Sequence, residues 1–205
     1  MERIGVSYYP WVDDDEDESF AWLDSSRKEE LDGRGYLLTE GVRCEEWFPK
    51  GLVFDLSKEG GSTLTDSIPN TFGMLVVSEK LKGILEQETP ADFIEYLPIR
   101  LRTPRKKVLT TPYYIANVLG SVACMDAKKS DFSMSSIVKT QVRRFRRLAL
   151  NEKKIPKDAK IFRLAEQTSL ILVREDLGQR IVDEDCLGVL FQELEDFGSE
   201  FRGRA

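Results

Sequence analysis

The chain has 205 residues, 41% of them hydrophobic and 10% aromatic, and a formal net charge of −6. This length gives one domain of ordinary size or two small ones, and the apolar content excludes wholesale disorder. The sequence contains no histidine, which excludes Ser-His-Asp and Cys-His catalysis, histidine-ligated metals and histidine pH switches.

The charge is distributed unevenly along the chain. Residues 1–66 carry 17 acidic and 7 basic side chains, a net charge of −10, whereas residues 100–160 carry 4 and 16, a net charge of +12. All three tryptophans lie in the acidic part. We therefore expect an acidic, aromatic N-terminal region over residues 1–66, packed on a second region over residues 67–200 within one compact unit.

Short elements and turns are expected in the N-terminal region. Residues 36–39 and 52–56 have the apolar and β-branched content of short strands. Turn signals follow at Asp32-Gly33, around Pro49 and at Gly60-Gly61. The pattern predicts mostly strand and loop here.

A strand–helix–strand unit is predicted after residue 72. Residues 72–77 are rich in β-formers, and Ser78 occupies the position of a helix N-cap. Apolar residues at 81, 84 and 85 have helical spacing, and Thr89-Pro90 ends the helix. Residues 93–101 alternate as in a strand, with Pro98 predicted at an edge or an interruption.

A second such unit is predicted near the end of the chain. Residues 170–173 and 187–194 resemble strands, and Leu177 and Ile181 lie on a short helix between them. The two units align at an offset of 96 residues, although any two short amphipathic units resemble each other to some degree. Residues 113–125 favour a strand but leave a helix open, and residues 137–150 fit either. The chain therefore predicts a strand-rich α+β fold, with two short strand–helix–strand units around a mainly antiparallel sheet.

No catalytic, cofactor or metal site is predicted. The sequence has no phosphate-binding loop and no Gly-x-Ser-x-Gly motif. Cys44, Cys124 and Cys186 are too far apart for a zinc or redox motif, so we expect three buried free thiols. The polar start at residues 1–5 lacks the features of a secretory signal, and no apolar run approaches the roughly 20 residues that cross a bilayer. These features predict a cytoplasmic protein that is not an enzyme, needs no cofactor and contacts no membrane.

The contiguous acidic run at residues 13–18 is the first candidate partner-binding site. Six adjacent carboxylates repel one another and stay hydrated, so the run is either a solvated loop or an electrostatic lure for a basic partner. Three aromatic residues nearby could anchor such a partner. The predicted contact residues are Asp13, Asp14, Asp15, Glu16, Asp17, Glu18, Trp11, Phe20 and Trp22.

The basic segment at residues 139–160 is the alternative binding site. Its four arginines flank Phe145 and could bind a phosphate backbone, or they could neutralise acidic groups within the fold or between subunits. No known nucleic-acid-binding motif accompanies them. The arginines of this basic patch are Arg143, Arg144, Arg146 and Arg147.

Several short, mostly apolar motifs follow one another along the chain. They lie at residues 65–69, 75–81, 93–99, 113–119, 124–126, 130, 161–164 and 171–177. In order and spacing, residues 64–197 resemble the immunity-protein-eleven family of bacterial polymorphic toxin systems. The first 60 residues resemble that family only loosely.

The resemblance implies a strand-rich α+β domain with no enzymatic activity and no catalytic residues. It favours a strand over residues 143–150, a capping role for Ser78, and turn or backbone-bonding roles for Asn117 and Asp126. It also implies a protein that binds and neutralises a cognate toxin domain, for which a nuclease is one candidate. The alternative is a nucleic-acid-binding regulatory module that uses residues 139–160. No pattern in the sequence indicates a particular oligomeric state.

Overall fold

The computed structural model describes residues 7–14, 17–25 and 28–199. The polar start at residues 1–5, and Asp15 and Glu16 of the acidic run, lie outside the described residues. The elements, in chain order, are β1 (Tyr8–Asp13), η1 (Glu29–Leu31), η2 (Gly35–Thr39), β2 (Val53–Asp55), β3 (Val76–Ser78), α1 (Glu79–Glu88), β4 (Ile94–Arg102), β5 (Tyr113–Val118), β6 (Asp131–Met134), β7 (Val142–Arg147), η3 (Glu152–Lys154), β8 (Ile161–Leu164), β9 (Gln167–Arg174), α2 (Glu175–Asp183) and β10 (Val189–Phe191).

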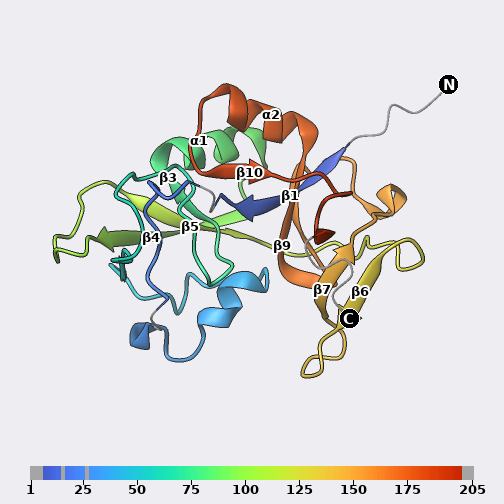
Figure 1. The fold of residues 1–205 in the computed structure, drawn as a ribbon, viewed down its shortest axis with the longest axis horizontal. Coiled ribbons are helices and arrows are strands. Elements are labelled where there is room, and N and C mark those ends of the chain that lie inside the picture. Colours follow the sequence, from blue (N-terminus) through green and yellow to red (C-terminus); the bar gives the residue numbers. More distant parts are fainter. Residues whose placement is uncertain (1–6, 15–16, 26–27, 200–205) are drawn as a thin grey trace.

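The described strands form two four-stranded sheets and one hairpin. One sheet has the order β10-β1-β9-β8, the other has the order β2-β4-β5-β3, and β6 pairs with β7. All pairs of named strands are antiparallel except β2 with β4. Figure 1 shows α1 and α2 side by side above the two sheets, with the β6–β7 hairpin projecting below. The predicted strand-rich α+β fold is confirmed.

The two strand–helix–strand units have the same topology. In the first unit β5 lies between β3 and β4, antiparallel to both. In the second unit β1 lies between β9 and β10, again antiparallel to both. The offset of 96 residues predicted from the sequence relates the first residues of the two helices, Glu79 and Glu175. The central strand of the second unit comes from the opposite end of the chain.

Three hydrophobic clusters fill the space between these layers. The central cluster joins both helices to both sheets and includes Val77, Leu81, Ile171 and Ile181. A second cluster packs the 21–56 segment on the sheet of β4 and β5. A third packs the β6–β7 hairpin, through Phe145, on the sheet of β8 and β9. Each helix therefore buries one face, as the spacing of its apolar residues predicts.

Several local predictions are confirmed. The Ser78 side chain accepts a hydrogen bond from the Leu81 N–H at 3.2 Å and so caps α1. Asn117 donates to the Val42 carbonyl at 2.8 Å, and Asp126 accepts from the Lys128 N–H at 3.1 Å in a turn. The three cysteines, residues 44, 124 and 186, are buried and free.

Other predictions need correction. The apolar content of residues 36–39 predicts a strand, but these residues lie in the 3₁₀-helix η2. The segment follows a turn at Gly33, and a helical turn buries Leu38 alone of its residues. The predicted long element at 113–125 ends at Val118, and Gly120 with φ of 70° then turns the chain. The ambiguous 137–150 segment contains a strand, β7, as the family resemblance implies.

The strand β4 runs without interruption through Pro98. Its pairing with β2 covers residues 100–102 only, and the Arg100 N–H donates to the Leu52 carbonyl at 2.9 Å. The backbone N–H groups of a strand point alternately to its two neighbouring strands. The backbone nitrogens of residues 98 and 100 therefore point to the same side, that of β2. The proline, which lacks an N–H, therefore faces the sheet edge just before β2 begins, which confirms the predicted edge position.

Candidate partner-binding surface

The acidic run follows directly from the end of β1. Asp13 is the last residue of the strand and is exposed, Asp14 is half-buried, and Asp17 and Glu18 are exposed. The Asp17 carboxylate accepts the Ser19 N–H at 2.9 Å, which fixes the turn. Hydrogen bonds from Ser19 hold the pKa of Asp17 below its usual value. The charged form of Asp17 is therefore favoured at the surface.

The three aromatic side chains near the run are held by the fold. Trp11 is only 9% exposed and contacts Phe191 edge-on, with ring centroids 5.0 Å apart. The Phe20 side chain is 8% exposed, and its backbone forms an isolated β-bridge with Thr63. Trp22 is half-buried. These rings therefore offer a partner much less area than the sequence suggested, and their contact role stays a prediction.

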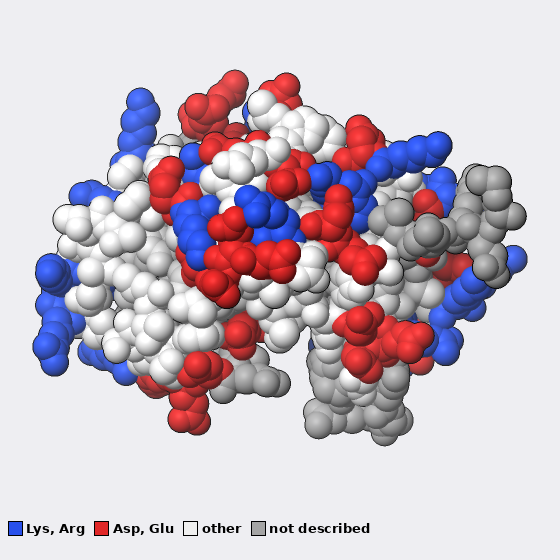
Figure 2. Space-filling model, turned by 90° about the horizontal axis from the view of Figure 1, so that it is seen from above, with Lys and Arg blue, Asp and Glu red and all other residues white. Residues whose placement is uncertain are grey.

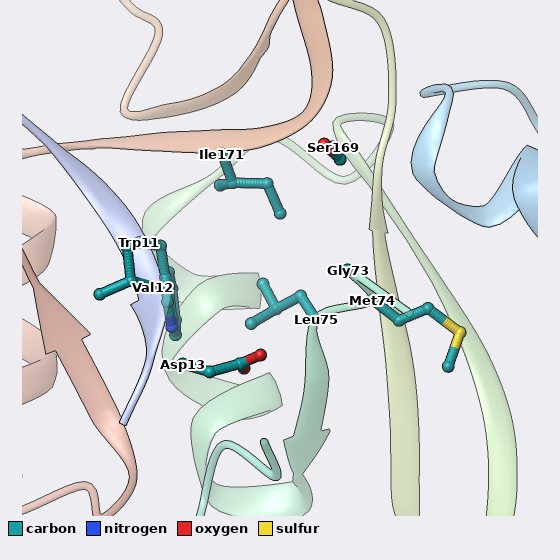
Figure 3. Close-up of a pocket in the computed structure, with 8 residues that line it drawn as sticks. All are labelled: Trp11, Val12, Asp13, Gly73, Met74, Leu75, Ser169 and Ile171. Atoms are coloured by element: carbon teal, nitrogen blue, oxygen red, sulfur yellow. The ribbon is translucent and has the colours of Figure 1, made fainter. Parts of the chain in front are cut away.

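A small pocket opens beside Asp13, between β1, β9 and the segment that leads into β3. Its volume is about 70 Å³. Figure 3 shows the Trp11 indole and the Asp13 carboxylate facing this space from β1. The lining residues are Trp11, Val12, Asp13, Gly73, Met74, Leu75, Ser169 and Ile171.

One buried asparagine shapes the wall of this pocket. The Asn70 side chain donates to the Ile68 and Met74 carbonyls at 3.2 and 2.7 Å and accepts the Met74 N–H at 3.1 Å. Its own backbone N–H donates to the Asp13 carboxylate at 3.3 Å. Asn70 therefore fixes the 70–74 loop and positions that loop relative to the end of β1.

Exposed apolar side chains border the acidic end of β1. Asp13 pairs in register with Val189 of β10, and the neighbouring Leu187 and Leu190 are 50% and 38% exposed. The Leu187 N–H donates to the Asp66 carboxylate at 3.0 Å, and the Lys80 ammonium lies 4.0 Å from the same carboxylate. We call this surface the β10 edge; its exposed apolar residues and the acids beside them are Val182, Leu187, Leu190, Asp13, Asp66, Asp183, Glu184 and Asp185.

The sequence indicated few of these residues. The pocket combines three segments that are far apart in the chain, and no local pattern joins them. Val182 is the exception, because an apolar residue outside the helical face of Leu177 and Ile181 indicates an exposed apolar side chain. It is 51% exposed.

The outer face of the helices has a different character. Figure 2 shows red and blue side chains interspersed over this face rather than gathered by sign. Ion pairs account for this pattern, among them Lys82–Glu86 at 3.0 Å and Arg180–Glu184 at 2.6 Å. The helical face therefore presents no patch of one charge.

The basic patch lies on the β6–β7 hairpin. Arg146 forms two hydrogen bonds with Asp131, at 2.7 and 3.0 Å, and Arg147 donates to the Lys129 carbonyl at 2.9 Å. Arg143 and Arg144 are exposed on the same strand. Part of the patch therefore stabilises the hairpin itself, and nucleic-acid binding by these arginines stays a prediction.

Chemistry-bearing groups outside these surfaces are few. Among residues 7–14, 17–25 and 28–199, no group of three or more Cys, Asp or Glu side chains is placed to hold a metal ion. Burial raises the pKa of Cys44 and Cys186 to about 11 and that of Cys124 to about 12, so these thiols are poor nucleophiles. No helix within these ranges is long and apolar enough to span a membrane.

Comparison with known proteins identifies the family. No curated protein matches the chain. The family model described as "Immunity protein family (Imm11)" matches residues 11–196, nearly the whole chain. The match begins in β1, so the acidic run lies inside the family region. The sequence resemblance, which covers residues 64–197, had placed the run outside that region. The chain therefore belongs to the Imm11 immunity protein family.

Proposed function

We propose that this protein binds a cognate toxin domain in the cytoplasm of the producing cell and blocks the toxin's active surface with the β10 edge and the adjoining acidic run. Membership of an immunity protein family supports toxin immunity as the biological role. The observation that supports this surface is the exposure of Asp13, which pairs in register with β10, and of Asp183 and Asp185, which precede the exposed Leu187.

This combination suits a basic partner. Apolar side chains at the centre of an interface supply affinity, and surrounding charge of one sign speeds association with the opposite sign. Nuclease toxins have basic active clefts because they bind phosphate backbones. An acidic surface with an apolar strip is complementary to such a cleft, so we propose a nuclease as the target.

The test is the association rate of the purified toxin domain encoded beside this gene. A variant with Asp13, Asp14, Asp17 and Glu18 changed to Asn or Gln should associate at least about tenfold more slowly at low salt. The difference should shrink at high salt, where mobile ions screen charges beyond a few ångströms.

A matched control removes the same charge elsewhere. Glu29, Glu30, Glu45 and Glu46 are exposed on the N-terminal region and belong neither to the acidic run nor to the β10 edge. Their change to Gln should leave most of the association rate intact. Equal slowing by both variants would mean that net charge alone matters, and an unchanged rate in the first variant would remove the acidic run from the interface.

A further inference from the structure

We infer that the pocket beside Asp13 is a socket for a single lysine or arginine side chain of the toxin, whose cationic head binds the Asp13 carboxylate beside the Trp11 ring. This inference rests on the proposed function. It separates Asp13 from Asp14, Asp17 and Glu18, since Asp13 alone among these four described acids lines the pocket (Figure 3).

The chemistry of the lining selects an amphipathic cation. Leu75 and Ile171 provide apolar walls that can contact the methylene stem of a long side chain. The Asp13 carboxylate faces the pocket, where the charged head of an inserted side chain would meet it. The indole face of Trp11 adds a cation–π contact, for which tryptophan is the best of the aromatic rings.

The size of the pocket limits the occupant. Its volume of about 70 Å³ is a little more than twice the share of one water molecule in the liquid, roughly 30 Å³. A space of this size admits the tip of one slender side chain, such as an ammonium or guanidinium group. The occupant is therefore one long basic side chain rather than a bulky apolar one.

The pocket is also preorganised. Asn70 holds both the 70–74 wall and, through its N–H, the carboxylate of Asp13 at 3.3 Å. A carboxylate already held in place loses little freedom when it binds a cation, so more of the interaction appears as affinity.

This geometry assigns different kinetic roles within one acidic run. Asp14, Asp17 and Glu18 attract a basic partner from a distance, which affects the association rate. Asp13 forms a partly desolvated pair with the inserted head, and the loss of such a pair acts mainly on the dissociation rate.

The decisive comparison is Asp13→Asn against Asp17→Asn, measured by surface plasmon resonance with the neighbouring toxin domain. Both variants remove one charge, and both keep a side-chain oxygen that can accept the hydrogen bond seen in the structure. D13N should raise the dissociation rate at least about tenfold, whereas D17N should change only the association rate. Equal dissociation rates in the two variants would overturn the socket.

A second variant tests the pocket without changing charge. Ser169 is an exposed β9 residue that lines the pocket, so Ser169→Leu should fill the space while preserving the fold. It should raise the dissociation rate as D13N does. A normal dissociation rate for S169L, with unfolding midpoints unchanged in both variants, would contradict an inserted side chain.

The toxin side supplies the final check. Each Lys and Arg of the toxin is changed to Gln, alone and together with D13N. One residue should show non-additive effects with Asp13, and no coupled residue would overturn the socket. If the unaltered proteins form no complex at all, the proposed function fails instead, so the two failures are distinguishable.

Discussion

Arg163 is fully buried, at 0% exposure, and it is the largest such side chain among the described residues. Its guanidinium donates to the carbonyls of Val118, Thr168 and Leu38 at 2.8, 2.9 and 3.0 Å. Burial lowers its pKa to about 10, so it keeps its charge at neutral pH. One side chain thus joins β8, the end of β5, β9 and the N-terminal helix η2.

Loss of this side chain should be severely destabilising. Arg163→Met would leave several buried carbonyls without a donor, and we expect a loss of about 3–5 kcal/mol in the free energy of unfolding. Urea denaturation followed by fluorescence measures it. Arg143→Met, at an exposed position, is the control and should stay within about 0.5 kcal/mol of the parent. A similar midpoint for both variants would contradict this account.

At the scale of elements, the two related helices begin differently. Ser78 caps α1, while Arg174 stands at the same position of α2 and no side chain caps it. Arg174 instead pairs with Asp176 in the first turn, at 2.6 Å. An acid in the first turn favours the helix N-terminus electrostatically, so α2 begins with a different stabilising device.

The cap of α1 has a measurable effect. Ser78→Ala removes the acceptor of the Leu81 N–H and should cost about 1 kcal/mol of stability. Chemical denaturation measures the loss, and faster hydrogen exchange in the first turn of α1 would locate it. Exchange that is unchanged there, despite lower stability, would place the effect elsewhere.

The pairing of β2 with β4 depends on a carboxylate. Arg102 donates two hydrogen bonds to Asp55, one of them at 2.8 Å, and Lys28 lies 3.2 Å from the same carboxylate. The hydrogen bonds from Arg102 above all, with Lys28, hold the pKa of Asp55 well below its usual value. The charged form is therefore the one that stabilises the fold.

This ion pair makes stability depend on pH in a defined direction. Because the folded-state pKa lies below the unfolded value of about 3.9, the contribution is complete above that pH and is lost as the pH falls further. At pH 7, Asp55→Asn should cost roughly 1–2 kcal/mol, since the side chain is one-fifth exposed and partly screened. Denaturation curves should show this gap closing below about pH 4, and a constant gap down to pH 2 would contradict the assignment.

At the scale of the whole molecule, the N-terminal region completes structures that begin elsewhere in the chain. Strand β1 is the central strand of the second strand–helix–strand unit. Residues such as Leu38 and Phe54 share one hydrophobic cluster with Leu101 and Ile115. Glu95 of β4 accepts the Cys44 N–H at 2.9 Å, which adds a buried polar link.

We therefore expect residues 1–66 and 67–200 to unfold together. Calorimetry should give one transition whose calorimetric and van't Hoff enthalpies agree. A chain that lacks residues 1–66 should fail to form a cooperative fold, because β9 and β10 would lose the strand between them. Two separable transitions in the full chain would show that the regions are independent.

The sequence by itself determined the elements that local rules govern. The helices were predicted because Leu81 and Leu85, or Leu177 and Ile181, recur with helical spacing after an N-terminal signal. The offset between the two units followed from the same pattern. The apolar residues of segment 36–39 suit several short conformations, and only contact with the rest of the fold selects the 3₁₀-helix.

Only the tertiary structure decided how distant segments meet. It placed Asp13 beside Ser169 and Met74 in one pocket, buried Arg163 within reach of three carbonyls, and exposed Leu187 at the β10 edge. The −6 net charge and the acidic run were visible in the sequence, but the separation of one anchoring carboxylate from its steering neighbours was not. The physical reason is that periodicity and composition act between neighbours in the chain, whereas burial and cavities depend on contacts between residues far apart in it.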